Sequence, residues 1–413
     1  MTPSNSSPSA PAPRDQRLAH PLQRWLLRLT RGLRVGTLRI ALPNGQRIDV
    51  QGTGPGPHAV LILHRWRAVL RMITNGDIGL ARSYRDGDWS SPDLLSVMAL
   101  ALENEAHLGA GAGGSRAMQC VDRIRHRLRA NTRKGSRDNI AFHYDLGNDF
   151  YKLWLDAELN YSSGIYGSGS ESLEEAQAAK MARILDLLKP DEGSDVLEIG
   201  CGWGALALAI AQRHRARVTG LTLSTQQLAH ARQRVAGEGL QASVDLRLQD
   251  YRDVGGTYDR IVSIEMLEAV GQAFWPGYFR VLRERLRPGG HAVLQVITIA
   301  DEHFDLYSRR ADFIQRFIFP GGMLPSWSAL QSQALGAGLA IERAAAFGQS
   351  YAATLAHWRA RFLQAREAVE SAGFDASFRR LWEYYLCYCE AGFRAGRVDV
   401  GLYVVRHAAK EAR

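Results

Sequence analysis

Three glycines stand at alternate positions in the stretch "VLEIGCGWG", at Gly200, Gly202 and Gly204. Glycine lets the backbone turn sharply after a strand, and it lets a ligand approach the main chain without meeting a Cβ atom. The segment "ALALAIAQRH" follows, and a helix there would present its N-terminal N–H groups to the same ligand. This combination is typical of sites for dinucleotides and for S-adenosylmethionine.

The details of the motif favour S-adenosylmethionine over a dinucleotide. Its spacing is G-x-G-x-G rather than G-x-G-x-x-G. The acidic residue that would hold an NAD ribose about 20 residues later is missing, and the next apolar stretch ends in "LTLSTQQ". Instead, Glu198 lies inside the motif. A glycine turn without a ligand is the remaining alternative, but three alternate glycines would cost conformational entropy without improving packing.

The elements that must position this motif alternate between helix-like segments and short apolar strands from about residue 170. The strands are expected at 195–200, 216–223, 244–250, 258–265 and 291–298, with a further one at 398–405. Such alternation predicts a parallel sheet covered by helices on both faces. Closer to the N-terminus, "TLRIALPNG", "QRIDVQG" and "HAVLILH" predict a small antiparallel sheet.

Composition limits the class of partner. The chain has 413 residues and a formal net charge of +9, which suggests two or three folded units and an anionic partner. No nucleic-acid-binding motif accompanies the run of basic residues between positions 123 and 137, so an anionic membrane surface is favoured over nucleic acid as the partner. The four cysteines form no CxxC pair, which argues against zinc and fits a reducing cytoplasm. The basic run comprises Arg123, Arg125, Arg127, Arg129, Arg133, Lys134 and Arg137.

Seven stretches together resemble one known family, that of the cyclopropane-fatty-acyl-phospholipid synthases and mycolic acid methyltransferases. The resemblance covers roughly residues 36–407, and the stretches occur in the family's order. They are "HYDLGNDFYKLWLDAELNYSSGIY", "VLEIGCGWGALALAIA", "VTGLTLSTQQLAHA", "DRIVSIEMLEAVG", "FIFPGGMLPS", "FGQSYAATLAHW" and "LCYCEAGFRAG".

The resemblance implies an α/β fold, a Rossmann-like seven-stranded methyltransferase sheet with a helical insertion that covers the lipid. A smaller α+β N-terminal domain is expected beside it. The expected boundaries are a disordered tail at 1–16, an N-terminal lipid-handling domain at 17–120, a basic linker at 121–140 and a catalytic domain at 141–413. Candidates for lining the lipid site are Phe313, Phe317, Ile318 and Phe319.

The implied activity is transfer of a methylene group from S-adenosylmethionine to a cis double bond of an unsaturated phospholipid acyl chain, giving a cyclopropane. A methyl- or methylene-branched product is the first alternative, and a non-catalytic lipid-binding protein is an alternative of another class. The expected location is cytoplasmic, at the inner membrane surface. A homodimer is compatible with the sequence, which does not determine the oligomeric state.

The resemblance also implies a cofactor site built from several segments. Tyr161 and Ser162 would close over the methionine end, whereas Thr222 and Gln227 would face the ribose. The full set of expected cofactor-binding residues is Tyr161, Ser162, Glu198, Gly200, Cys201, Gly202, Gly204, Thr222, Leu223, Gln227, Asp250, Tyr251 and Arg252.

The expected base site departs from the family pattern. Relatives hold a bicarbonate ion there with a cysteine, a glutamate, a histidine, a backbone group and a tyrosine. Here Glu268 and Tyr351 match, but Ser163 replaces the cysteine and Gln295 replaces the histidine. A neutral glutamine supplies no positive charge, so bicarbonate becomes an open question.

A second carboxylate, Glu265, offers another explanation. It precedes Glu268 by about one helical turn, so both carboxylates could face one pocket. We hypothesise that one of them replaces the ion as the base, and the alternative is that Glu265 faces solvent or pairs with an arginine. Cys389 matches a family cysteine and is a further candidate, although the chemistry requires no thiolate.

Overall fold

The computed structural model describes residues 21–108, 132, 135 and 146–409. The tail predicted at 1–16 lies outside the described residues. So does the basic linker predicted at 121–140, apart from residues 132 and 135.

The N-terminal part forms a four-stranded sheet with helices packed on it, in the strand order β2-β1-β3-β4. The prediction of an antiparallel sheet was wrong in one pairing, because β1 and β3 run parallel. The connection between them passes through β2, which pairs antiparallel with β1. The elements are α1 (Pro21–Thr30), β1 (Val35–Ala41), β2 (Arg47–Gln51), β3 (Gly54–Leu63), α2 (Arg67–Arg85), β4 (Trp89–Ser90), α3 (Leu94–Glu103) and α4 (Glu105–Leu108).

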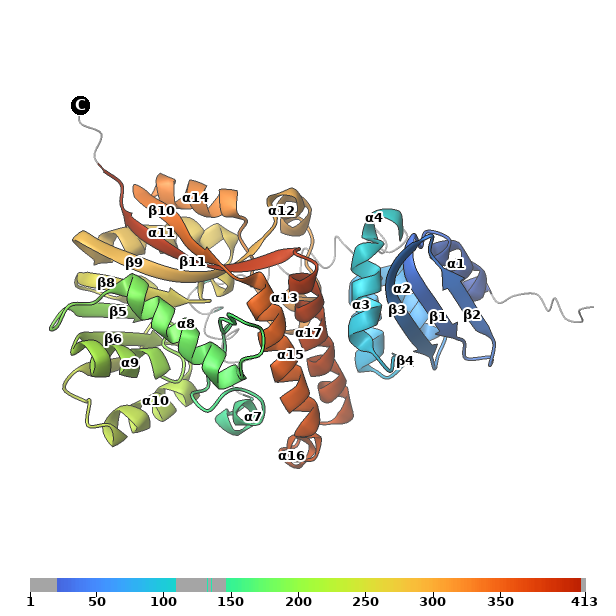
Figure 1. The fold of residues 1–413 in the computed structure, drawn as a ribbon, viewed down its shortest axis with the longest axis horizontal. Helices are drawn as coiled ribbons and strands as arrows, with labels where there is room; N and C mark the ends of the chain where they lie inside the picture. Colours follow the sequence, from blue (N-terminus) through green and yellow to red (C-terminus); the bar gives the residue numbers. More distant parts are fainter. Residues whose placement is uncertain (1–20, 109–131, 133–134, 136–145, 410–413) are drawn as a thin grey trace, which may run out of the picture.

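The C-terminal part contains the expected seven-stranded sheet, in the order β10-β11-β9-β8-β5-β6-β7 (Figure 1). The five strands from β9 to β7 in this order are parallel, whereas β11 pairs antiparallel with both β9 and β10. The strands are β5 (Asp195–Ile199), β6 (Arg217–Thr222), β7 (Val244–Leu248), β8 (Tyr258–Ile264), β9 (Leu286–Ile299), β10 (Leu339–Ala346) and β11 (Val398–His407).

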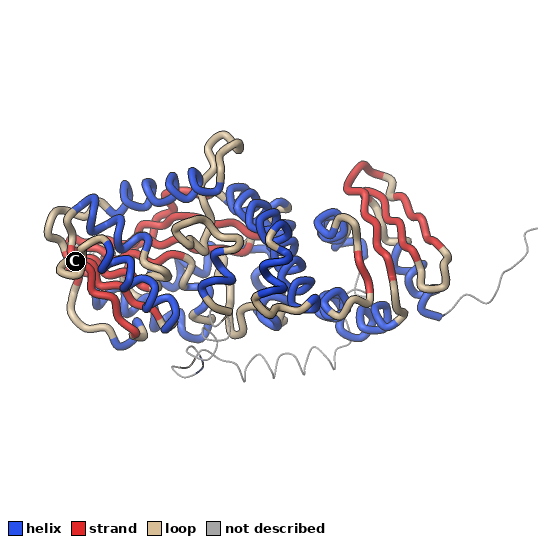
Figure 2. The backbone as a smooth tube through the Cα atoms, turned by 90° about the horizontal axis from the view of Figure 1, so that it is seen from below, coloured by secondary structure: helices blue, strands red, loops and turns tan. Residues whose placement is uncertain are grey.

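Helices cover both faces of this sheet, as Figure 2 shows from below. Their starts follow local capping rules: the side chain of Ser172 caps α8 in a capping box with Glu175, and Ser224 caps α10. The helices are α7 (Asn148–Lys152), α8 (Leu173–Leu188), α9 (Ala205–His214), α10 (Thr225–Gly237), α11 (Trp275–Arg285), α12 (Asp301–Ser308), α13 (Phe313–Phe317), α14 (Trp327–Gly336), α15 (Gly348–Gln364), α16 (Arg366–Ser371) and α17 (Ala376–Arg394). Short 3₁₀ turns are η2 (Tyr251–Asp253), η3 (Leu267–Ala269) and η4 (Gln272–Phe274).

The order in which the chain adds strands to the sheet reverses at β5. The chain continues from β5 to β6 and β7 on one side, then crosses to β8 on the other side. In open parallel sheets, ligands bind at the carboxyl ends of the strands beside such a switch point. The segments after β5 and β8, which carry the glycine motif and Glu265, are therefore the expected place for a ligand.

The N-terminal unit (residues 21–108) packs against the C-terminal unit (residues 146–409) through α2 and α3, which contact α17 (Figure 1). One hydrophobic core joins the two units, because Leu100 of α3 belongs to the same cluster of buried residues as Trp358 and Trp382. Every helix within residues 21–108 and 146–409 is too short or too polar to cross a bilayer.

Candidate active site

The glycine turn after β5 combines backbone requirements with open space. The φ angles of Gly200, Gly202 and Gly204 are +85°, +52° and +87°, in the region that disfavours L side chains. A Cβ atom on Gly200 would lie 2.5 Å from Cγ of Met266, and one on Gly204 would lie 3.0 Å from Cβ of Ala231. A Cβ atom on Gly202 would meet nothing within 4 Å. Gly202 therefore borders the space where a ligand could lie against the main chain.

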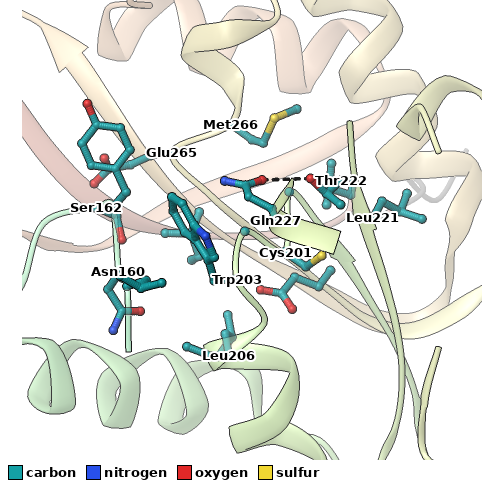
Figure 3. A pocket seen from close by; sticks show the side chains of 18 of the residues that line it. Asn160, Ser162, Cys201, Trp203, Leu206, Leu221, Thr222, Gln227, Glu265 and Met266 are labelled. Carbon is teal, nitrogen blue, oxygen red and sulfur yellow. Dashed lines mark hydrogen bonds between the residues drawn. The ribbon is translucent and has the colours of Figure 1, made fainter. Parts of the chain in front are cut away.

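A cavity of about 150 Å³ opens at this turn (Figure 3). Figure 3 shows Ser162 and Glu265 at one side of it and Thr222 at the other. The hydroxyl of Thr222 donates a hydrogen bond of 2.9 Å to Oε1 of Gln227. Ten predicted cofactor residues line this cavity: Tyr161, Ser162, Glu198, Gly200, Cys201, Gly202, Thr222, Leu223, Gln227 and Tyr251.

Three predicted cofactor residues do not line the cavity. Gly204 packs against α10 instead. Asp250 and Arg252 pair with each other, with 2.6 Å between Oδ2 and the guanidinium, and the preceding residue Gln249 reaches the cavity. The carboxylate of Asp250 also caps η2, which turns it toward the backbone.

Sequence reasoning missed other residues of this cavity, among them Lys180. The residue lies on α8, 2% exposed, and its Nζ donates a hydrogen bond of 2.8 Å to Oγ of Ser162. Burial is the main reason that the pKa of Lys180 falls to about 8. The available signal was a lysine in an otherwise apolar stripe of the helix, "LEEAQAAKMARILDLL". The other missed residues include Asn160, Met181, Trp203, Gln249 and Met266.

Glu198 presents an unsatisfied acceptor to the same space. The side chain is 3% exposed, and its Oε2 atom has no hydrogen-bond partner. Burial raises the pKa of Glu198 to about 8. An orphaned buried carboxylate oxygen is costly unless a ligand supplies a donor. Together with the open main chain at Gly202, it fits an amino-acid-bearing nucleoside such as S-adenosylmethionine.

A second, larger cavity of about 660 Å³ adjoins the first, and its lining is mostly apolar. The volume is in the range typical of small-molecule sites. Both units of the protein line it: α2 contributes Ile78, α3 contributes Met98 and Leu102, and the C-terminal unit contributes Ile297 and Leu355. Of the four predicted lipid-lining residues only Phe319 reaches this cavity, whereas Phe313, Phe317 and Ile318 do not. Phe313 and Ile318 are instead buried in the core.

The two cavities meet at Tyr161 and Glu265, which line both. The hydroxyl of Tyr161 lies 2.9 Å from that of Tyr385. The larger cavity, but not the smaller one, is also lined by Tyr351, Glu268 and Cys389. A group bound in the small cavity can therefore face a chain bound in the large one across Tyr161 and Glu265.

Three donors from distant segments hold the Glu265 carboxylate. Oε1 accepts from the backbone N–H of Ser163 at 2.9 Å and from Nε2 of Gln295 at 2.7 Å. Oε2 accepts from the hydroxyl of Tyr351 at 2.7 Å. Glu265 therefore neither faces solvent nor pairs with an arginine, and that alternative is wrong. Ser163 and Gln295 line neither cavity but position Glu265 from behind.

The backbone of Glu265 is left-handed, with a φ of +48° directly after β8. Such a conformation costs a non-glycine residue on the order of 1 kcal/mol or more, and the surrounding contacts must offset it. Glu268 follows in the 3₁₀ turn η3. The two glutamates share a cavity because a strand end and a 3₁₀ turn direct them there, and not because they lie on one helix.

Glu268 is the second carboxylate of this pair. Its Oε1 accepts from the backbone N–H of Ile297 at 2.5 Å, and its Oε2 is buried without a partner. Burial and the nearby charge of Glu265 raise its pKa to about 8. Burial also raises the pKa of Glu265. Two coupled carboxylates of this kind can hold and exchange one proton near neutral pH.

Cys389 has no feature of a reactive thiol. It packs in the aromatic core, and burial raises the pKa of its thiol above the ordinary value. The thiolate is the reactive form of cysteine, so this environment disfavours a nucleophilic role.

The sequence matches one protein family over most of its length. The family described as mycolic acid cyclopropane synthetase matches residues 131–402. The tuberculostearic acid methyltransferase of Mycobacterium tuberculosis is 40% identical over 353 residues, which cover 82% of this chain and 81% of the relative. The chain belongs to the mycolic acid cyclopropane synthetase family.

Other members of the family support the assignment of the cofactor. The cyclopropane-fatty-acyl-phospholipid synthase of Escherichia coli K12 is 35% identical over 336 residues, which cover 80% of this chain and 83% of the relative. The crystal structure of a mycolic acid cyclopropane synthase complexed with SAH and CTAB is 31% identical, with a TM-score of 0.62, and covers 65% of this chain and 97% of its own. This protein is an S-adenosylmethionine-dependent methyltransferase of the cyclopropane synthase family.

Proposed function

We propose that this family member methylates a carbon of a cis double bond in a phospholipid acyl chain and releases a methylene-branched chain. The observation that carries the proposal is the junction of the two cavities at Tyr161 and Glu265. The small cavity suits S-adenosylmethionine, and the large apolar one suits an acyl chain. S-adenosylmethionine supplies an electrophilic methyl group when bound.

The chain's own residues orient the alkene and exclude water. An alkene is a weak nucleophile, so its alignment with the methyl group in a dry cavity is the first requirement. Attack joins the methyl carbon to one alkene carbon and leaves a carbocation on the other. The rings of Tyr161, Phe319 and Tyr385 lie close together at this place, and aromatic faces attract a cation.

Glu265 is the proposed base. Its donors are the backbone of Ser163 and the side chains of Gln295 and Tyr351, at the positions implied to hold bicarbonate in relatives. We therefore propose that its carboxylate takes the place of that ion. A raised pKa suits a base that works near neutral pH.

The product depends on how the carbocation is resolved. A hydride can first shift from the methylated carbon to the neighbouring cationic carbon, so that the methylated carbon becomes the cation. Glu265 then takes a proton from the new methyl group, and the C–H electron pair forms the double bond of a methylene (=CH₂) branch. Without the shift, the same electron pair closes a cyclopropane ring. The substituted base site and the 40% identity to a tuberculostearic acid methyltransferase favour the branch. The 35% identity to a cyclopropane-fatty-acyl-phospholipid synthase keeps the ring as the second candidate.

In this proposal the acyl chain enters the large cavity from a membrane. Exposed residues of the large cavity mark its opening: Asp77 and Glu105 come from the N-terminal unit, Leu306 from α12, and Arg310 from the segment after α12. We propose that the N-terminal unit handles the lipid by forming one wall of this opening. Contact with an anionic membrane surface at the cytoplasmic side fits the net charge of +9.

Expression in a bacterial host without cyclopropane or branched lipids tests the function. Mass spectrometry should show acyl chains heavier by one methylene unit. Fragmentation should place a methylene (=CH₂) branch on a former alkene carbon. A ring in place of the branch would select the second candidate. Unmodified lipids in cells that contain folded protein would refute the function.

A further inference from the structure

The large cavity is open at one side and closed at another, and its closed end lies in the N-terminal unit. The lining residues of α3 share one face of the helix, because they are spaced by about one helical turn: Val97, Met98, Ala101 and Leu102. Val97 and Met98 are buried, each 8% exposed, whereas Ala101 is exposed. The cavity therefore becomes deeper from the end of α3 toward its start.

Trp89 of β4 closes the cavity at this depth. Its side chain is 1% exposed and packs against Tyr84, with 4.8 Å between the ring centroids. Tyr84 packs in turn on Tyr384 of α17, with 5.7 Å between the centroids. The indole N–H of Trp89 donates to the carbonyl oxygen of Leu80 at 2.9 Å. We call the space bounded by Ile78, Trp89, Val97 and Met98 the end pocket.

The chemistry of the end pocket suits hydrocarbon. Its four side chains carry no charge, and the one N–H group among them, that of the indole, is already hydrogen-bonded. The charged residues that the N-terminal unit contributes to the cavity, Asp77 and Glu105, are exposed at its opening instead. Buried apolar walls favour methylene groups, because binding removes both surfaces from water.

The junction with the cofactor cavity and the end pocket lie on two sides of α17. Tyr385 faces the junction, since its hydroxyl lies 2.9 Å from that of Tyr161. The preceding residue, Tyr384, faces the N-terminal unit, where it packs on Tyr84. Both α17 tyrosines line the same large cavity. A chain whose double bond lies beside Tyr161 can therefore continue past α17 into the end pocket.

An internal cis double bond requires a space of this kind. The reacting carbons lie within the acyl chain, so a segment of methylene groups continues beyond them to the methyl end. The cis geometry bends the chain and turns this segment away from the part that leads to the head group. With the reacting carbons at Tyr161 and Glu265 and the head group at the opening, the methyl-terminal segment needs a closed apolar space.

We propose that the end pocket holds the methyl-terminal segment of the acyl chain and limits how many carbons can follow the double bond. This inference rests on the proposed function and adds a substrate preference to it. Val97 and Met98 are then specificity residues, because the size of their side chains sets the depth of the pocket. The N-terminal unit selects the chain, and the C-terminal unit carries out the chemistry.

Three phospholipids measure the depth of the pocket. Their reacting chains are palmitoleoyl, oleoyl and gadoleoyl, which share the distance from the carboxyl group to the double bond and differ in the segment beyond it. The full chain receives them together in mixed vesicles, and mass spectrometry of the products gives the ratios of kcat/KM. Wild-type protein should discriminate between at least two of them by about tenfold, the usual effect of added methylene groups in an apolar pocket. Equal values for all three would overturn the proposal.

Two variants change the depth in opposite directions. Met98→Ala should raise kcat/KM for the gadoleoyl chain relative to the palmitoleoyl chain by about tenfold, whereas Val97→Phe should lower this ratio by a similar factor. Leu94→Ala is the matched control, because Leu94 lies on the same helix and is 4% exposed but does not line the cavity. It should lose stability in thermal denaturation and keep the wild-type ratio.

The outcomes are distinct. A folded Met98→Ala protein with the wild-type ratio would refute the role of the end pocket, and if Met98→Ala does not fold, an unchanged ratio in Val97→Phe would do the same. A ratio that follows the length of the second, saturated chain of the lipid would show that the pocket holds that chain, and the proposal would be wrong. Absence of product from every lipid would overturn the proposed function and this inference with it, whereas product at equal rates would overturn the inference alone.

Discussion

Replacement of Glu265 by glutamine removes the proposed base while keeping its shape. The carboxylate accepts three hydrogen bonds, from Ser163, Gln295 and Tyr351. A glutamine amide offers one acceptor oxygen, so its NH₂ group would face donors and at least one buried donor would lose its acceptor. Loss of a general base costs about 10² to 10⁴ in rate. This corresponds to about 2.7 to 5.5 kcal/mol of transition-state stabilisation.

The assay measures release of S-adenosylhomocysteine from Glu265→Gln and wild-type protein with unsaturated phospholipid vesicles in bicarbonate-free buffer. The wild type should retain its activity without bicarbonate, whereas the variant should lose about two orders of magnitude or more. Glu383→Gln is the matched control, because Glu383 is partly buried and accepts a hydrogen bond from Tyr84 but lines neither cavity. The control should retain wild-type activity.

A second substitution at the same position tests whether the carboxylate occupies the place of an ion. Glu265→Gly removes the side chain and relieves the left-handed backbone at φ +48°. The donors of Ser163, Gln295 and Tyr351 would then be free to hold a small anion. Added bicarbonate or formate should restore part of the activity to this variant and none to wild type. Full activity of Glu265→Gln, or a wild type that requires bicarbonate, would refute the reasoning.

Four further predictions concern the same site. Tyr351→Phe removes a hydrogen bond that lowers the pKa of Glu265, so the acid limb of the pH–rate profile should move to higher pH by about one unit or more; an unchanged profile would contradict this. Wild-type activity should fall as pH drops through the raised pKa values of the Glu265–Glu268 pair, with a midpoint above the ordinary glutamate value, and a midpoint near 4.5 would argue against a buried base. Gly202→Val places a branched side chain at φ +52° and into the cofactor space, so the dissociation constant of S-adenosylmethionine should rise at least about tenfold, measured by calorimetry. In the folded protein the pKa of Glu198 is raised to about 8, whereas in the unfolded chain it is near 4.5. The free energy of unfolding of the cofactor-free wild type should therefore decrease as the pH rises from about 4.5 to about 8. Thermal denaturation at pH 5 and pH 8 should show a smaller decrease for Glu198→Gln than for wild type, by up to a few kcal/mol.

Local sequence patterns were sufficient for most of the C-terminal sheet. The alternation of apolar strands and helices predicts a covered parallel sheet, which the structure confirms, but the edge strand β10 was not among the strands expected from the pattern. The number of seven strands followed from the family resemblance. The N-terminal sheet was harder, because the parallel pairing of β1 with β3 is not encoded in the alternation of either strand. Alternation identifies which face of a strand is buried, but it does not identify its neighbour.

The cofactor cavity was predictable in part for a similar reason. Residues next to the glycine turn, such as Glu198, lie where the motif places them. Asp250 and Arg252 do not line the cavity but pair with each other, a pairing that depends on the local turn η2, and their role in cofactor binding stays a prediction. Lys180 was missed because a lysine on a helix is usually solvated, and only the packing of α8 against the cavity buries it.

The sequence by itself predicted where a methyl donor would lie, because a strand followed by alternate glycines leaves the main chain open and this geometry is local. Only the tertiary structure decided which groups contact Glu265 and which cavity its carboxylate lines. Its three donors come from residues 102, 30 and 86 positions away, and they meet only after the sheet and α15 have assembled. The N-terminal wall of the acyl cavity likewise exists only because α2 and α3 pack on α17. Chemistry that depends on groups brought together by long-range packing cannot be read from spacing alone.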